Sequence, residues 1–103
     1  MSTPSKRRKE KPTVTPNAFM DHDKKFYYIE VELPGVKKDE IELSVSDQSF
    51  CVRAQREDIE FLGCYVLAHL ADTDSTRAKF ANGLLSMEIP LKKAQKEKKV
   101  AIE

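Results

Sequence analysis

Apolar and polar side chains alternate in several short stretches between residues 17 and 90. In "FYYIEVEL", the side chains of Tyr27, Ile29, Val31 and Leu33 fall on one face of an extended chain. Glu30 and Glu32 fall on the other face. A period of two residues is typical of a strand with one buried and one solvated face. No stretch of this region has a helical period, so the pattern predicts an all-β body.

The same alternation recurs along the chain and predicts three more inward-facing rows. These rows are Ile41, Leu43 and Val45, then Phe50, Val52 and Ala54, and finally Leu85, Met87 and Ile89. Short alternating strands that are separated by regularly spaced turns favour an antiparallel, immunoglobulin-like β-sandwich. A chain of 103 residues has room for one such domain, in which the inner faces of the two sheets share a core.

Turn residues stand between the predicted strands. Pro34 precedes Gly35 in "LPGV", which suits a type II turn because its second central residue needs a positive φ. "SDQS" at 46–49 is short enough to join two strands as a hairpin. Asn82-Gly83 predicts a type I′ hairpin turn, in which both central residues have positive φ.

Charge divides the chain into three parts, although the net charge is only +1. Residues 1–16 carry +4, residues 17–90 carry −6 and residues 91–103 carry +3. We therefore predict a disordered basic N-terminal arm (1–17), a sandwich domain (18–90) and a flexible C-terminal tail (91–103). The basic run "KRRKEK" lacks interleaved aromatic residues, so nucleic acid is not an expected partner. The basic segments either stay solvated or contact acidic surface.

The expected compartment is the cytoplasm. The sequence has no apolar run of membrane-spanning length and no signal-like apolar stretch near its start, so no membrane partner is expected. In the cytosol, Cys51 and Cys64 are expected to be reduced thiols. His22 and His69 do not form close ligand pairs with either cysteine, so no metal site is predicted.

The acidic side chains do not suggest catalysis. Glu30, Glu32, Glu42 and Glu88 alternate on outward faces, which is typical of a solvated surface rather than an acid–base pair. The serines have no nucleophile-elbow context, and the glycines lie too far apart to form a phosphate loop. The sequence therefore predicts a protein that is not an enzyme and has no cofactor.

Four stretches in order carry a family resemblance. They are "FYYIEVELPGVKKDEIELSV", "FCVRAQRED", "AKFANGLLSMEIPL" and the terminal "VAI". This pattern, over roughly residues 18–103, resembles the α-crystallin domain of small heat-shock proteins. The resemblance implies an antiparallel β-sandwich of seven to nine strands. It also implies a chaperone that holds partly unfolded client proteins without ATP.

The resemblance also implies a role for the end of the chain. In this family, a tail motif with Ile or Val at two positions two residues apart inserts into a groove at the edge of a sandwich, and Val100 and Ile102 match it. The implied groove walls here are Ile41, Leu43, Val45, Ala78 and Phe80. The tail reaches either its own groove or that of a neighbouring chain, and we expect self-association through the second route.

Three departures from the family pattern bear on assembly. Only "DIEFLG" stands between Glu57 and Cys64, where many members have a longer insert that exchanges with a partner. Gly63 stands where the family usually has an arginine, and the N-terminal arm is polar rather than apolar. These departures leave a second hypothesis open: a co-chaperone-like sandwich adaptor that binds one folded partner and holds no clients.

Overall fold

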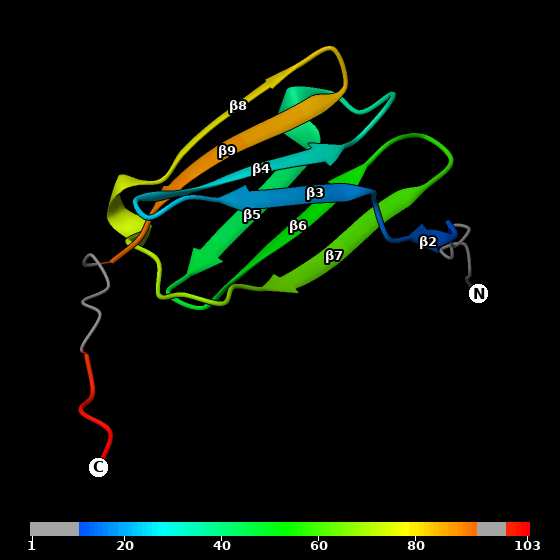
Figure 1. Cartoon of the computed structure of the whole chain (residues 1–103). Helices are drawn as coiled ribbons and strands as arrows, with labels where there is room; N and C mark the ends of the chain where they lie inside the picture. Colours follow the sequence, from blue (N-terminus) through cyan, green and yellow to red (C-terminus); the bar gives the residue numbers. More distant parts are fainter. Residues whose placement is uncertain (1–10, 93–98) are drawn as a thin grey trace.

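The computed structural model describes residues 11–92 and 99–103. They form two four-stranded sheets that face each other as a β-sandwich, which confirms the predicted fold class (Figure 1). All strand pairs are antiparallel except one short parallel pair at the edge of the second sheet.

The first sheet has the order β3-β4-β9-β8. Its strands are β3 (Ala18–His22), β4 (Phe26–Glu32), β8 (Arg77–Ala81) and β9 (Leu84–Pro90). In this sheet β4 and β9 are central and pair along their whole lengths, from Phe26–Pro90 to Glu32–Leu84. The sheet therefore brings the first and last predicted strands of the body together.

The second sheet has the order β2-β7-β6-β5. Its strands are β2 (Thr13–Val14), β5 (Ile41–Ser46), β6 (Ser49–Gln55) and β7 (Glu60–Val66). Two short 3-10 turns, η1 (Lys38–Glu40) and η2 (Thr73–Ser75), precede β5 and β8. The strands β5, β6 and β7 form a meander with tight connections.

The core lies between the inner faces of the two sheets. The rows predicted from alternation on β4, β6 and β9 are all buried, and Ile29, Val52 and Ile89 are completely inaccessible to solvent. Each large apolar side chain that is buried in this way contributes about 1.5–3 kcal/mol to folding. The row on β5 is only half-buried, because β5 lies at the edge of its sheet.

Two of the predicted turns contact each other at one end of the sandwich. Gly35 has a φ of 82°, and the Val36 N–H donates to the Leu33 carbonyl (3.3 Å), as a type II turn requires. Asn82 and Gly83 have φ values of 52° and 80°, the signs of a type I′ turn. The Leu33 N–H donates to the Gly83 carbonyl (2.7 Å), which joins the β4 end to the β8–β9 hairpin.

The sandwich extends beyond both boundaries predicted from charge. Thr13 and Val14 of the predicted arm form β2, and the Glu60 N–H donates to the Pro12 carbonyl (3.0 Å). At the other end, Leu91 bridges to Ala71 and the Lys92 N–H donates to the Leu70 carbonyl (2.8 Å). Residues 1–10 and 93–98, the remainder of the arm and part of the tail, lie outside the described residues.

A disulfide joins Cys51 on β6 to Cys64 on β7. The prediction of two reduced thiols is therefore wrong for this structure. The two residues are direct partners in the β6–β7 ladder, with Cα atoms 4.1 Å apart. Because they stand thirteen residues apart in the sequence, on strands whose register the sequence alone does not give, their pairing was not predicted.

Candidate functional site

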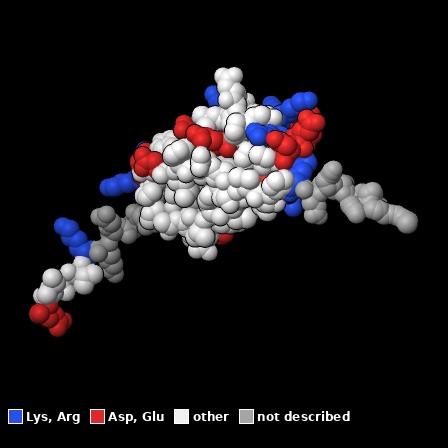
Figure 2. Space-filling model, turned by 90° about the vertical axis from the view of Figure 1, so that its right-hand side faces the viewer, with Lys and Arg blue, Asp and Glu red and all other residues white. Residues whose placement is uncertain are grey.

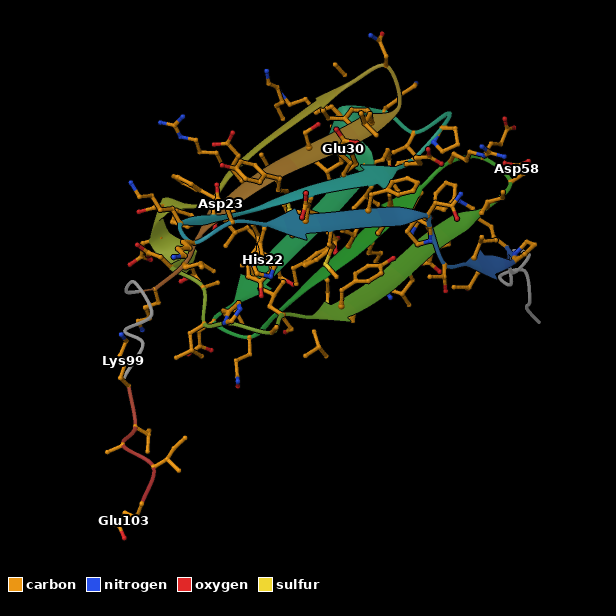
Figure 3. The ribbon with its side chains drawn as sticks, in the orientation of Figure 1. His22, Asp23, Glu30, Asp58, Lys99 and Glu103 are labelled. Carbon is orange, nitrogen blue, oxygen red and sulfur yellow. A yellow bond between two sulfur atoms is a disulfide. The ribbon has the colours of Figure 1, made fainter. Side chains whose placement is uncertain are left out.

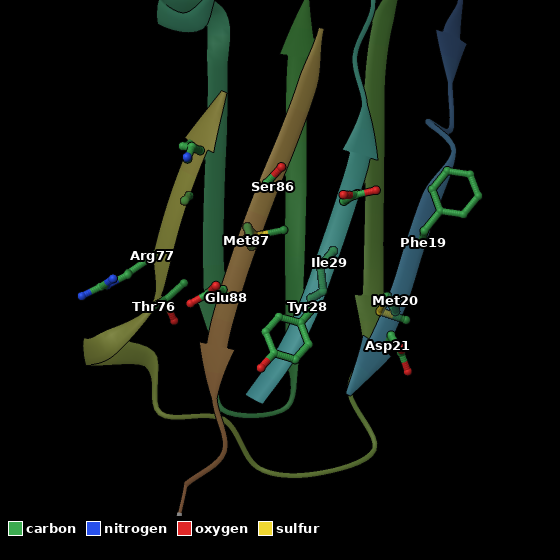
Figure 4. Close-up of a pocket in the computed structure, with 13 residues that line it drawn as sticks. Phe19, Met20, Asp21, Tyr28, Ile29, Thr76, Arg77, Ser86, Met87 and Glu88 are labelled. Carbon is green, nitrogen blue, oxygen red and sulfur yellow. The ribbon is translucent and has the colours of Figure 1, made fainter. Parts of the chain in front are cut away.

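The structure places the five predicted groove residues on two edge strands. Among the described residues, no strand pairs with the outer edge of β5 or of β8, and Figures 1 and 4 show both strands along the same side of the sandwich. We call β5 and β8 together the open side. An unpaired strand edge presents a row of free backbone N–H and C=O groups, so it can accept another strand.

The side chains on the open side form an apolar rim. Ile41, Leu43 and Val45 on β5 are half-buried and pack against the core, as does Phe80 on β8. Ala78 also belongs to the inward row of β8, opposite buried Met87, but it is exposed. The open side therefore offers both unpaired backbone and partly exposed apolar side chains.

The two residues of the tail motif are exposed. Val100 retains 78% and Ile102 95% of its accessible surface, so neither is inserted into a groove of its own chain. Figure 3 shows the segment from Lys99 to Glu103 directed away from the sandwich. The base of the tail is held by the body, because the Leu91 N–H donates to the Lys25 carbonyl (2.8 Å).

The opposite side of the sandwich is partly occupied by residues 11–17. β2 pairs with Glu60 and Phe61 at the start of β7, and the Glu32 N–H donates to the Asn17 carbonyl (2.9 Å) where the chain turns into β3. Lys11 Nζ donates to Gln55 Oε1 (3.0 Å) and to the Arg56 carbonyl (2.8 Å). We call β7 and β3, with the segment 11–17 across them, the covered side.

Tyr65 holds the segment 11–17 against the sandwich, a role that the sequence did not predict. Its ring stacks on Phe50 at a centroid distance of 4.8 Å, and its hydroxyl donates to the Pro16 carbonyl (3.1 Å). A Cβ atom at Gly63 would lie 2.5 Å from that hydroxyl, so the absence of a side chain at Gly63 makes room for the ring. Burial raises the pKa of the Tyr65 hydroxyl and keeps it a donor at neutral pH.

A hollow of about 980 Å³ lies on the outer face of the sheet β3-β4-β9-β8 (Figure 4). Phe19 and Tyr28 line it and are 56% and 42% exposed. The charged residues in its lining are Asp21, Glu30, Arg77, Lys79 and Glu88. Tyr28, at an outward position of a predicted strand, was a sequence signal for this hollow, whereas Phe19 lies on β3, which was not predicted.

The carboxylates of Asp23 and Asp58, near opposite ends of the sandwich, accept hydrogen bonds from neighbouring residues. The Lys25 N–H, and then the Phe26 N–H, donate to Asp23 Oδ1 (both 2.8 Å) and lower the pKa of Asp23. At the other end the Arg56 guanidinium donates to Asp58 (2.8 Å) and lowers the pKa of that carboxyl. The hydroxyl of Tyr28 has a raised pKa, chiefly through desolvation and also through its hydrogen bond to Asp23.

The surface has mixed charge, and the described residues hold no cluster of potential metal ligands. On the face shown in Figure 2, acidic and basic side chains are interspersed along the upper part, above a largely uncharged middle. Within residues 11–92 and 99–103, no three His, Cys, Asp or Glu side chains cluster as metal ligands. Over the same residues, no helix is long and apolar enough to cross a membrane.

Comparison with known proteins gives consistent results. The model of the Hsp20/alpha crystallin family matches residues 19–103. The "18 kDa antigen 2" of Mycobacterium avium is 29% identical over 107 residues, covering 89% of this chain and 76% of the relative. "Small heat shock protein C4" of Rickettsia felis is 27% identical over 105 residues, covering 86% of this chain and 64% of the relative. The chain spans only 60% of a third relative, the "18 kDa antigen 1" of Mycobacterium intracellulare.

Solved structures show the same fold. Heat shock protein 16.0 from Schizosaccharomyces pombe superimposes with a TM-score of 0.72 at 24% identity, covering 88% of this chain and 77% of that one. A small heat-shock protein from Xylella fastidiosa, described as having a distinct high order structure, gives a TM-score of 0.67 at 18% identity. That match covers 86% of this chain and 96% of the Xylella chain.

Proposed function

Because the chain belongs to the Hsp20/alpha crystallin family, we propose that it is an ATP-independent chaperone that holds partly unfolded proteins and prevents their aggregation. The observation that carries this proposal is the open side, where two strand edges with no described partner strand border half-buried Leu43, Val45 and Phe80. An extended client segment pairs its backbone with such an edge and fills the apolar positions with alternate side chains. Neither step needs a nucleotide or a catalytic group.

The tail motif is the proposed competitor for this surface. Val100 and Ile102 lie two residues apart and are exposed, so an extended tail presents both on one face. Burying the two side chains contributes about 3–5 kcal/mol before the cost of ordering the tail. That magnitude suits a contact that forms and opens reversibly, and so alternates with client binding.

We propose that the tail binds the open side of another chain. Because Leu91 and Lys92 are held by the body, seven residues, 93–99, separate it from the motif, and fully extended they span up to about 25 Å. This reach allows either a self-contact or a contact between chains, and in the structure the side chains of Val100 and Ile102 are 78% and 95% exposed. The tail's charge of +3 against −6 on residues 17–90 gives a modest attraction at physiological salt.

Holding activity is tested with an aggregating client. Excess protein should delay the aggregation of a heat- or reduction-sensitive client, and the delay should be equal with and without ATP. Light scattering of the client measures the effect. Protection that depends on ATP, or no protection at any ratio, would remove the proposal.

The tail contact is tested with Val100→Ala/Ile102→Ala. This double variant should have a lower solution mass by light scattering, an unchanged β-sheet circular dichroism spectrum and equal or greater client binding. Ala101→Ser is the matched control, because in an extended tail its side chain points away from the edge. If the double variant keeps the parent mass at every concentration, the tail does not link the chains.

The adaptor hypothesis has one observation in its favour. The described part of the N-terminal arm lies across the covered side and exposes only one large apolar side chain, Val14, so it adds little apolar surface for clients. An adaptor would bind one folded partner at a fixed stoichiometry through the open side. Fixed binding of that kind, together with failure to protect any client, would favour the adaptor over the chaperone.

A further inference from the structure

The Cys51–Cys64 bridge lies on the outer face of the sandwich rather than in its core. Both side chains point outward from the sheet β2-β7-β6-β5, since their neighbours Phe50, Val52 and Gly63 are buried on the inner side. Cys64 is exposed and Cys51 is half-buried. A bridge in this position is accessible to solutes while the protein remains folded.

The ladder aligns the two cysteines whether or not the sulfurs are bonded. Cys51 and Cys64 are the third of seven consecutive β6–β7 pairs, which run from Ser49–Val66 to Gln55–Glu60. The Arg53–Glu60 ion pair (3.0 Å) crosses the same two strands. The inner faces of both strands are anchored in the core, so opening the bridge leaves the two thiols facing each other.

A shallow hollow of about 400 Å³ gives access to the bridge from one side. Its lining includes Ser44, Cys51, Arg53 and Leu62. Glu42 and Arg53 contribute charges of both signs to this lining, and Arg53 is ion-paired with Glu60.

We propose that Cys51 and Cys64 form a reversible dithiol–disulfide site on the native surface. A dithiol reductant opens the site without unfolding the sandwich, and the reduced pair chelates a thiophilic acceptor such as a trivalent arsenical. The site then has two chemical states. In a reducing compartment the pair stands as the dithiol that the sequence predicted, and under oxidation it forms the bridge of the structure.

The exchange proceeds in two steps. One thiolate of the reductant attacks Sγ of the more exposed Cys64, breaks the Sγ–Sγ bond and expels Cys51 as a thiolate, leaving a mixed disulfide on Cys64. The second thiolate of the reductant then attacks the reductant sulfur that is bonded to Cys64. The mixed disulfide breaks, and Cys64 leaves as a thiolate. The reductant is oxidised to a cyclic disulfide, and its two protons pass to Cys51 and Cys64.

Chelation by the reduced pair is a separate, non-redox step. Phenylarsine oxide forms one As–S bond to each sulfur, and its oxygen leaves with the two thiol protons as water. Direct ladder partners suit this product, because the arsenic must reach both sulfurs from one position. A single thiol forms only one such bond and holds the arsenical weakly.

The first test counts thiols on the intact chain in native buffer. After oxidation with diamide, the parent should show no thiols. Its mass should be about 2 Da below that of the reduced chain, since forming the bridge removes two hydrogens. After reduction with dithiothreitol and its removal, two thiols should react with Ellman's reagent while the circular dichroism spectrum stays unchanged. Thiols that react only in denaturant, or loss of the spectrum on reduction, would overturn the proposal.

The second test uses two matched variants, each with one cysteine. The thiol of Cys51→Ser, which leaves exposed Cys64, should react with Ellman's reagent about threefold faster than that of Cys64→Ser, because access limits the rate. The reduced parent should bind one phenylarsine oxide per chain and keep it against excess monothiol, whereas both variants should release it. Equal retention by parent and variants would show that no chelating pair exists.

Discussion

The two long sides of the sandwich differ in what lies against their strand edges. On the open side, β5 and β8 end their sheets with no described strand beyond them. On the covered side, residues 11–17 run from the start of β7 across to β3, held by backbone pairing with Glu60 and Phe61 and by the Tyr65 hydroxyl, although β3 also ends its sheet with no described strand beyond it. Both sides belong to the same two sheets, so the difference comes from one short segment of the chain.

This difference bears on which surface is free for partners. A free edge accepts an extended peptide, whereas an edge that its own chain already pairs must first release that segment. The connection between β6 and β7 is also only four residues long, so it cannot cross to a second chain. The open side is therefore the stronger candidate for binding the tail motif and clients. Four predictions test the comparison between the two sides.

Gly63→Val should have the largest effect on stability, because the new side chain displaces Tyr65, which holds residues 11–17 on the covered side. Gly63 is buried, and its Cβ would lie 2.5 Å from the Tyr65 hydroxyl and 2.9 Å from its ring. Displacing Tyr65 overpacks the site and breaks its bond to Pro16, at a cost of about 2–4 kcal/mol. Thermal unfolding measures the loss. Adding Tyr65→Ala should restore part of it, and an unchanged melting temperature for Gly63→Val would contradict this account of the covered side.

Gly83→Val should disturb the open side through its hairpin. Gly83 has a φ of 80°, which a β-branched residue rarely adopts, so the expected cost is about 1–3 kcal/mol. The register of β8, and with it the positions of Ala78 and Phe80, depends on this turn. Gly83→Asn is the matched control because Asn tolerates positive φ. Equal melting temperatures for the Val and Asn variants would contradict the turn assignment.

Tyr65→Phe should loosen the covered side without overpacking it. The ring can still stack on Phe50, but the hydrogen bond to the Pro16 carbonyl is lost, which costs about 0.5–1.5 kcal/mol. The Glu60 N–H, which donates to the Pro12 carbonyl, should exchange with solvent faster as the segment detaches more often. Amide hydrogen exchange measures this change. Unaltered exchange at Glu60 would mean that Lys11 and β2 hold the segment without Tyr65.

Acidification should have the smallest effect, at the β3–β4 turn beside the covered side. Backbone donors hold the pKa of Asp23 below its ordinary value of 3.8, so its contribution to stability is present above that pH. The contribution is lost as the pH falls through the lowered pKa, because the unfolded chain takes up the proton first. Asp23→Asn should flatten the dependence of the melting temperature on pH below about 4 relative to the parent. Identical profiles of melting temperature against pH for the parent and the variant would show that protonation of Asp23 is not linked to folding. The slope that remains in the variant would include the contribution of Asp58, whose pKa is also lowered.

Much of the fold could be predicted because its signals are local. An inward row such as Ile29, Val31 and Leu33 is apparent from alternation alone, since successive side chains of any strand point to opposite faces. The Asn82-Gly83 turn is similarly local, because few residues adopt positive φ. For the candidate site, the sequence identified the strands β5 and β8 through a family resemblance. It did not indicate that Ala78 would be exposed while Phe80 is half-buried.

The remaining features depend on contacts between residues far apart in the sequence. Polar composition predicted a disordered arm up to residue 17, yet pairing with β7 and the hydroxyl of Tyr65 hold its last residues on the sandwich. The register of β6 against β7 decided that Cys51 faces Cys64, and it also placed Tyr65 opposite Phe50. The sequence by itself determined which face of each strand is apolar, because that property belongs to consecutive residues. Only the tertiary structure decided which edges are covered and which side chains meet, because those outcomes depend on how separate strands align.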